Sequence, residues 1–302
     1  LGGARAAVVM TGDDHGGNGT PTRFGELAAL DPDAGAPHAW DRVRATSYVV
    51  PESPLSAATA AELARQGFEI SLHATVRDDR FTDGTIDLGQ QLRAFRAAFP
   101  DVPAPVTHRT HCVPWSDWST QAEVERAHGI RLDANYYFFP TPWVRDRPAH
   151  FTGSALPMRF ARASGEVIDC YQLVTQLTDE SGQTFPATID SLLDQALEPD
   201  GHVAVLTANM HTDLPGSNGS DAIVAAALAR GVPVVSARQM LTWLDARAGS
   251  SFSCTTRSRD GVRGTLRVHP DADGLVAMVP LDPADGEVTS VSVADRPVDF
   301  WH

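Results

Sequence analysis

Short apolar strands alternate with helical segments along most of this chain, and this alternation restricts the fold more than any other feature of the sequence. Three helical segments begin at a serine that can cap a helix and end at a glycine, over residues 56–67, 119–129 and 220–231. Strands that alternate with helices build a mostly parallel sheet or barrel, so the sequence predicts an α/β fold. The strand candidates lie at residues 6–10, 45–50, 68–73, 105–111, 129–133, 202–211 and 232–236.

The pattern changes after about residue 249. The segment 250–302 has short strand-like runs, turn signals at Asp260-Gly261 and Asp273-Gly274, and no helical period. We therefore expect a barrel domain over residues 1–248 and a small β-rich module over 249–302 that is cut short at its end. We expect this module to be a structural cap on the barrel rather than a separate sugar-binding unit.

Charge and composition exclude several classes of partner. The formal net charge is −14, which argues against a nucleic-acid partner or an anionic membrane surface. No apolar run approaches the length that crosses a bilayer, so we expect no membrane insertion. The three cysteines are too few and too scattered for a zinc finger or a disulfide framework.

Polar, titratable residues stand at the ends of four predicted strands. In parallel α/β folds, functional groups gather where the carboxyl ends of the strands meet their loops. Taken singly, paired aspartates before glycines are mostly a helix cap or a turn, and a histidine at a strand end is mostly structural. Four polar strand ends together favour a functional site. The residues are Asp13, Asp14, His73, Arg109, His111 and His211.

The first of these ends, TGDDHG at residues 11–16, raises the question of a metal. Asp13 and Asp14 follow an apolar run directly. Burying two ionised carboxylates side by side is costly unless a cation or a proton lies between them. The sequence therefore indicates a cation or a shared proton at this strand end.

Five segments occur in the order of the motifs of a known family: TGDDHG, EISLH, HRTHCVPW, IRLDANYY and VLTANMHTD. In this order and spacing, residues 6–247 resemble the polysaccharide deacetylases, also called the NodB-homology or carbohydrate esterase family four group. The resemblance implies a distorted (β/α) barrel, a divalent metal that is usually zinc, and removal of N- or O-acetyl groups from sugar polymers. It also implies a secreted or cell-surface location, although no signal peptide is present in this sequence.

The same resemblance implies roles for individual residues. Asp13 matches the general base, and Arg109 the arginine that orients it. Asp133 matches the acid that pairs with that arginine, and His211 matches the general acid for the leaving amine or alkoxide. Asp213 lies one residue later than the family's usual partner of that histidine, so its role is left open.

The resemblance also implies metal ligands, with one departure. Asp14 and His73 match two of the family's three ligands, but the position of the third is Arg77, and a cation does not bind a cation. His111 is the preferred replacement, because the period of two puts it on the same strand face as Arg109. Asp14, His73 and His111 would supply the three protein ligands that catalytic Zn²⁺ requires. Weaker candidates are Asp78, Asp79 and His15.

Aromatic residues follow two of the site strands. They can stack on the C–H faces of sugars or simply pack in the core, and the sequence leaves both open. We expect a metal-dependent hydrolase that removes acetyl groups from an N- or O-acetylated oligosaccharide or polymer. The alternatives are an inactive carbohydrate-binding barrel without metal and a metal-dependent amidase for a small non-sugar amide. The aromatic residues are Trp115, Trp118, Tyr136, Tyr137 and Trp143.

Overall fold

The computed structural model of the chain describes residues 1–31, 35–76, 81, 86–136, 154–213, 216, 219–258, 261–277, 288–293 and 295–298. Several residues singled out in the sequence lie outside these ranges. They are Arg77, Asp78, Asp79, Tyr137 and Trp143.

The described elements alternate between strands and helices, as the sequence predicts. The helices are α1 (Thr20–Ala28), α2 (Ala57–Arg65), α4 (Leu88–Ala98), α5 (Thr120–Ala127), α7 (Ala187–Leu197), α8 (Ser220–Leu228) and α9 (Ala237–Ala248). The main sheet is built from β1 (Ala6–Asp14), β2 (Thr46–Val49), β3 (Glu69–Ala74), β4 (Thr107–Thr110), β5 (Leu132–Asp133), β6 (Met158–Ala161), β7 (Val167–Gln172), β8 (Thr175–Thr178), β9 (Ala204–Asn209) and β10 (Val234–Val235).

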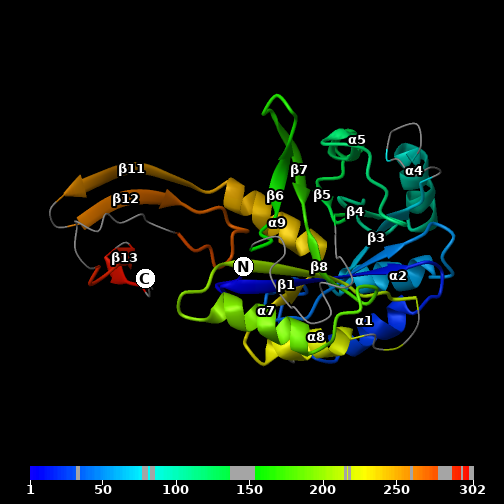
Figure 1. Ribbon diagram of the computed structural model, residues 1–302, viewed down its shortest axis with the longest axis horizontal. Helices are drawn as coiled ribbons and strands as arrows, with labels where there is room; N and C mark the ends of the chain where they lie inside the picture. Colours follow the sequence, from blue (N-terminus) through cyan, green and yellow to red (C-terminus); the bar gives the residue numbers. More distant parts are fainter. Residues whose placement is uncertain are drawn as a thin grey trace.

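The main sheet curls until its two ends are joined by one segment of chain. Its order is β6-β7-β5-β4-β3-β2-β1-β9-β8, and the pairs are parallel except for β6 with β7. β7 lies between the edge strand β6 and β5 at one end of this order, and β8 pairs with β9 at the other end. Because only Leu173 and Val174 separate β7 from β8, this segment links the two ends. The predicted distorted (β/α) barrel is confirmed (Figure 1).

Two apolar cores lie on the two faces of the sheet, and the period of two along β1 divides its residues between them. Val8 and Met10 belong to the core under the surrounding helices. Ala7 and Val9 face the interior, where they pack with side chains of α9 such as Met240. The same period continues to the end of β1, which determines where its two aspartates point.

The helix starts show how local chemistry sets the element boundaries. Ser56 caps α2, because its side chain accepts a hydrogen bond from the backbone N–H of Thr59 at 3.0 Å. At α5 the predicted Ser119 is the N-cap residue, but its side chain makes no capping hydrogen bond, and Asp117 accepts the N–H of Thr120 at 2.9 Å instead. At α8 the N-cap residue is Gly219, one position before the predicted serine. None of the helices in the described part of the chain is long and apolar enough to span a membrane.

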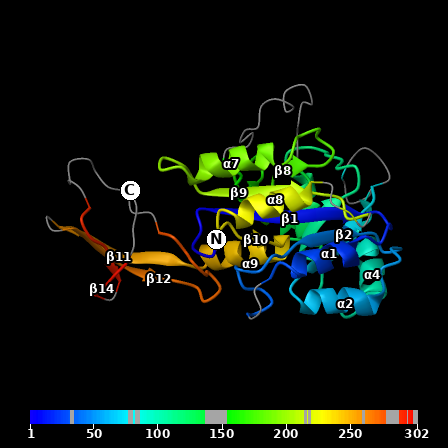
Figure 2. The same ribbon diagram turned by 90° about the horizontal axis from the view of Figure 1, so that it is seen from below.

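A small β module follows α9, as predicted. It contains the hairpin of β11 (Ser251–Ser258) with β12 (Gly261–Arg267) and the short pair of β13 (Ser292–Val293) with β14 (Arg296–Pro297). The hairpin extends away from the barrel, as the two views show (Figure 1 and Figure 2). Its position leaves the carboxyl ends of the barrel strands to the loops of the barrel itself.

Candidate active site

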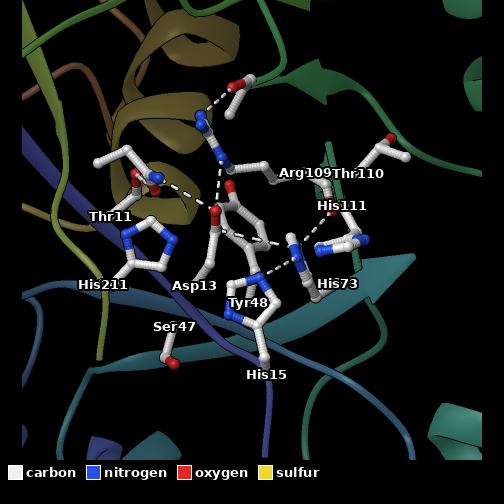
Figure 3. Close-up of polar contacts among 12 residues, drawn as sticks. Thr11, Asp13, His15, Ser47, Tyr48, His73, Arg109, Thr110, His111 and His211 are labelled. Atoms are coloured by element: carbon white, nitrogen blue, oxygen red, sulfur yellow. Dashed lines mark hydrogen bonds and ion pairs between the residues drawn. The ribbon is translucent and has the colours of Figure 1, made fainter. Parts of the chain in front are cut away.

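Asp13 lies at the centre of a polar cluster where β1, β3, β4 and β9 end (Figure 3). As an odd-numbered residue of β1 it points inward, like Ala7 and Val9. Its Oδ2 atom accepts hydrogen bonds from Arg109 Nε and Asn209 Nδ2, each at 3.0 Å. Its Oδ1 atom is buried and has no hydrogen-bond partner among the described residues. One oxygen of Asp13 is therefore fixed and the other is available to a ligand.

Charge around Asp13 keeps it ionised. Burial by itself raises the pKa of this carboxyl. The positive charge of Arg109, the nearby His73 and the hydrogen bond from Asn209 together lower the pKa by more than burial raises it. The net result is a pKa below the ordinary value of an aspartate. A buried carboxylate in this state can accept a proton, which fits the role of a general base.

Arg109 braces the base against the opposite side of the barrel. The side chain is 1% exposed, and its Nη1 atom donates to the carbonyl of Ala134 at 2.8 Å and to Thr175 Oγ1 at 3.1 Å. These contacts tie β4 to the segment after β5 and to β8. The guanidinium is therefore held in place independently of Asp13.

Asp133, which the family resemblance paired with Arg109, lies instead in a separate buried network. Its carboxyl accepts the N–H of Asn135 at 2.8 Å and the Asn135 side-chain amide at 2.9 Å, and it also contacts Gln121. Burial, with the neighbouring Glu125, raises its pKa well above the ordinary value. Among the described contacts, the protonated Asp133 thus supports α5 rather than Arg109.

Glu125 completes that network behind the barrel wall. Its Oε1 atom lies 2.6 Å from His108 Nδ1, and both side chains are 0% exposed. Burial raises the pKa of Glu125 to about 8 and lowers that of His108 to about 4. The pair therefore consists of a protonated carboxyl and a neutral imidazole that share one hydrogen bond.

His211 is held by a carboxylate that the sequence analysis missed. Asp179, which directly follows β8, accepts from His211 Nδ1 at 2.9 Å and from its backbone N–H at 3.0 Å. The hydrogen bond and charge of Asp179 outweigh partial burial and raise the pKa of His211 to about 9. The imidazole is thus protonated at neutral pH, as a general acid must be.

Asp213, whose role the sequence left open, holds His15 in the same way. Its Oδ2 atom lies 2.8 Å from His15 Nδ1, and its Oδ1 atom accepts the backbone N–H of His15. Each of the two histidines is therefore fixed by one carboxylate that contacts both its ring and its backbone.

Three imidazoles gather beside Asp13, and we refer to His15, His73 and His111 as the histidine cluster. Their ring centroids are 4.9 Å apart for His15–His73, 5.0 Å for His15–His111 and 5.7 Å for His73–His111. The Nε2 atoms of His15 and His73 lie 3.2 Å apart. The ring of His211 stacks on His15 at 5.3 Å.

Burial keeps His73 neutral. The side chain is 1% exposed, and its pKa falls to about 4, chiefly through desolvation. Its Nδ1 atom lies 3.1 Å from the carbonyl of Arg109, to which it donates. The Nε2 atom of His73 therefore carries a lone pair that faces the cluster.

His15 also belongs to a group of potential metal ligands with His211 and Asp213. One ligand atom from each of His15, His211 and Asp213 lies within 4.8 Å of the others. His15 and Asp213 hydrogen-bond to each other within this group. This is the usual arrangement of a metal-binding histidine with the carboxylate that orients it.

Asp14 is not part of the histidine cluster, which departs from the predicted ligand set. Its Oδ1 atom accepts the N–H groups of Gly16 and Asn18 at 3.0 and 3.2 Å, and its Oδ2 atom accepts the hydroxyl of Thr20 at 2.7 Å. The period of two turns it away from Asp13, toward the start of α1. Its carboxylate caps the loop and the helix that follow β1.

Two of the predicted aromatic side chains are exposed at the surface. Trp118 is 72% exposed and Tyr136 is 39% exposed. The ring of Trp115 lies 6.0 Å from Tyr136 and 6.2 Å from Phe160, centroid to centroid. Trp115 is thus packed against its neighbours, whereas Trp118 and Tyr136 present surface to solvent.

Comparison with known proteins gives only distant similarities. No family model matches the chain, and no curated protein matches it. Among solved structures it is similar to a chitin deacetylase from Colletotrichum lindemuthianum, with 15% identity, TM-score 0.47, and coverage of 78% of this chain and 87% of that one.

Two further solved structures are similar at the same level. A family 4 acetyl xylan esterase from Clostridium thermocellum, in complex with a cobalt ion, has 13% identity, TM-score 0.41, and coverage of 78% of this chain and 90% of that one. A CE4 family pseudoenzyme from Bacillus anthracis has 11% identity, TM-score 0.44, and coverage of 78% and 65%. Because these similarities are distant, we base the function on the geometry of the site.

Proposed function

We propose that this protein is a metal-dependent hydrolase that removes acetyl groups from an N- or O-acetylated glycan. The observation that carries the proposal is the pairing of Asp13 with His211 at one rim of the barrel. Asp13 is a buried carboxylate with one available oxygen, and His211 is an imidazolium fixed by Asp179. Two titratable groups whose environments favour opposite proton states form an acid–base pair.

Asp13 acts as the base in this proposal. Arg109 and Asn209 hold its Oδ2 atom, so the carboxylate does not rotate when it takes up a proton. The Oδ1 atom, which has no hydrogen-bond partner in the described part of the chain, accepts a proton from the attacking water. A positioned base of this kind contributes about 10²- to 10⁴-fold to the rate.

His211 acts as the acid. Asp179 occupies its Nδ1 atom, so Nε2 is the atom that donates to the leaving nitrogen or oxygen. The proton that Asp13 takes from water and the proton that His211 gives to the leaving group balance across the reaction. Acid and base then return to their starting states by exchanging a proton with solvent.

A divalent cation such as Zn²⁺ fits the donor atoms beside this pair. Of the predicted ligands, the structure brings His73 and His111 together, and these imidazoles would hold the cation. Neutral imidazoles are ligands that zinc prefers. A cation there supplies Lewis-acid polarisation of the acyl carbonyl and makes a water molecule more acidic.

The exposed aromatic side chains support a glycan as substrate. Trp118 follows β4, which pairs with the strand that carries His73, and Tyr136 follows β5, which pairs with β4; both offer flat apolar faces. Such faces stack on the apolar side of sugar rings. A secreted or cell-surface location, implied by the family resemblance, would give the enzyme access to polymeric glycans.

The test is acetate release by the zinc-loaded protein from acetylated chitooligosaccharides, acetylated xylan, peptidoglycan fragments and simple N-acetyl amides. Release from at least one glycan, and faster than from the amides, supports the proposal. Release from the amides alone supports the small-molecule amidase. Binding of glycans without any release supports the carbohydrate-binding barrel and refutes the hydrolase.

A further inference from the structure

The strand end of β1 supplies one side chain to the histidine cluster, and the structure shows which one. Asp14 accepts hydrogen bonds from Gly16, Asn18 and Thr20, and it is 0% exposed. Both of its oxygens are therefore engaged on the helix side of the sheet. A cation at the cluster would have to break this cap in order to recruit Asp14.

His15, the next residue, is placed and oriented as a ligand. Asp213 accepts from its Nδ1 atom at 2.8 Å and from its backbone N–H, which fixes the ring. With the proton on Nδ1, the lone pair is on Nε2. Metal-binding histidines usually donate their other ring nitrogen to a carboxylate or carbonyl in this manner.

The contact between His15 and His73 indicates a cation. The Nδ1 atom of each ring has an acceptor, Asp213 for His15 and the Arg109 carbonyl for His73. The two Nε2 lone pairs consequently face each other at 3.2 Å. Two acceptors at this distance repel unless a cation or an added proton lies between them. Two nitrogens bound to one tetrahedral zinc at about 2.05 Å are about 3.3 Å apart.

The third imidazole, that of His111, lies beside the other two rings. The ring centroids of the three pairs within the histidine cluster are 4.9, 5.0 and 5.7 Å apart. His111 follows β4 on the inward face, so β1, β3 and β4 each supply one imidazole.

We propose that His15, and not Asp14, is the ligand from β1, so that the metal centre consists of His15, His73 and His111 with Asp213 as a positioning residue. This inference rests on the proposed function for the presence of a catalytic metal. An all-imidazole centre lacks a carboxylate, and it therefore selects Zn²⁺, Co²⁺ or Ni²⁺ over Mg²⁺ and Ca²⁺, which require oxygen ligands.

The experiment measures metal binding directly. The full chain and its variants are titrated with Zn²⁺, with zinc per chain read by plasma mass spectrometry and the environment by the visible spectrum of the Co²⁺ form. We expect His15→Ala to bind zinc at least about 100-fold more weakly, and Asp213→Asn about 10- to 100-fold more weakly. We expect Asp14→Asn to keep the zinc affinity of the wild type and to melt at a lower temperature. Millimolar Mg²⁺ is expected not to compete.

The control is His269→Ala, which removes an exposed imidazole of the β module and is expected to bind zinc like the wild type. Unchanged zinc binding by His15→Ala, or its loss in a folded Asp14→Asn, overturns the inference. If His15→Ala does not fold, the zinc affinity of Asp213→Asn tests the inference instead, because this variant keeps all three imidazoles. Unchanged zinc affinity in Asp213→Asn then overturns the inference. Zinc binding through His15 without acetate release refutes the proposed function alone. Acetate release with zinc retained in His15→Ala refutes only this ligand set.

Discussion

Asp13 and Asp14 are neighbours in the chain, but their carboxylates lie on opposite faces of β1. Asp13 faces the barrel interior, where it accepts hydrogen bonds from Arg109 and Asn209. Asp14 faces α1 and accepts the hydroxyl of Thr20. The strand runs through both residues, so the period of two separates them. A pair of aspartates therefore divides here into one residue for chemistry and one for structure.

Asp14→Ala should destabilise the protein. The substitution leaves the N–H groups of Gly16 and Asn18 and the hydroxyl of Thr20 without their acceptor. The loss of these hydrogen bonds and of the cap costs about 2–4 kcal/mol in the free energy of unfolding. Urea denaturation measures this loss. A change below about 0.5 kcal/mol would show that the cap does not matter.

Gly17→Ala should disturb the loop that carries His15. A Cβ atom at Gly17 would lie 2.0 Å from the carbonyl oxygen of Asp213, so the two loops must separate. We expect weaker zinc binding and a lower melting temperature. The matched control is Gly25→Ala in α1, where a Cβ atom meets nothing within 4 Å. This control should stabilise the protein by up to about 1 kcal/mol, because alanine favours a helix over glycine. Equal effects of the two substitutions would contradict this account of the loop.

Glu125 should make the folded state less stable at high pH. Its pKa is about 8 in the folded protein, against 4.5 for an ordinary glutamate, so folding requires a proton that the unfolded chain has released. Below pH 4.5 the Glu125 carboxyl is protonated in the folded and in the unfolded protein, and its contribution to stability is fully present. This contribution is lost as the pH rises through 8. His108, whose pKa is lowered from 6.5 to about 4, acts in the opposite direction only below pH 6.5.

The measurement for Glu125 is therefore the free energy of unfolding between pH 6.5 and 8.5, in wild type and Glu125→Gln. A single proton gives a slope of at most about 1.4 kcal/mol per pH unit. The wild type should lose stability over this range, and Glu125→Gln should lose less, with Asp133 accounting for the remainder. The exposed Glu52→Gln serves as control. Parallel curves for wild type and Glu125→Gln would refute the buried proton.

Asp179→Asn should lower kcat about 10- to 100-fold with little change in KM, because Asp179 positions the general acid rather than binding substrate. The comparison is Glu180→Gln, since Glu180 is more exposed and its Oε1 atom lies 4.0 Å from His211 Nε2. We expect a much smaller effect on kcat for that variant. An increase in KM with kcat unchanged in Asp179→Asn would place Asp179 in substrate binding.

The fold and the inward face of the site follow from patterns that are local in sequence. Short strand-like runs between helical segments locate β1, β3, β4 and β9, and the period of two places His73 and Arg109 on the inward face. The predicted barrel is confirmed because strand–helix alternation leaves few other arrangements. The predicted roles of Asp13, His211 and the metal ligands stay predictions until they are measured.

The remaining features depend on contacts between distant segments. β7 and β8 are not among the predicted strands, so Asp179 after β8 was missed, although the same strand-end rule would have found it. These partners are not visible in any motif, since His15 meets Asp213 and Asp133 meets Gln121 only in the folded chain. The sequence pattern indicated which polar residues stand at strand ends, but not which of them form hydrogen-bonded pairs.

The most direct test of the proposed chemistry is the rate of acetate release from an N-acetylated chitooligosaccharide by the zinc-loaded wild type and by Asp13→Asn. The substitution keeps the size of the side chain and removes the negative charge that accepts the proton. We expect release by the wild type and a rate at least about 100-fold lower for Asp13→Asn at equal zinc content. Equal rates for the two proteins, or no release from any acetylated glycan by the wild type, would contradict the assignment of Asp13 as the base of a deacetylase.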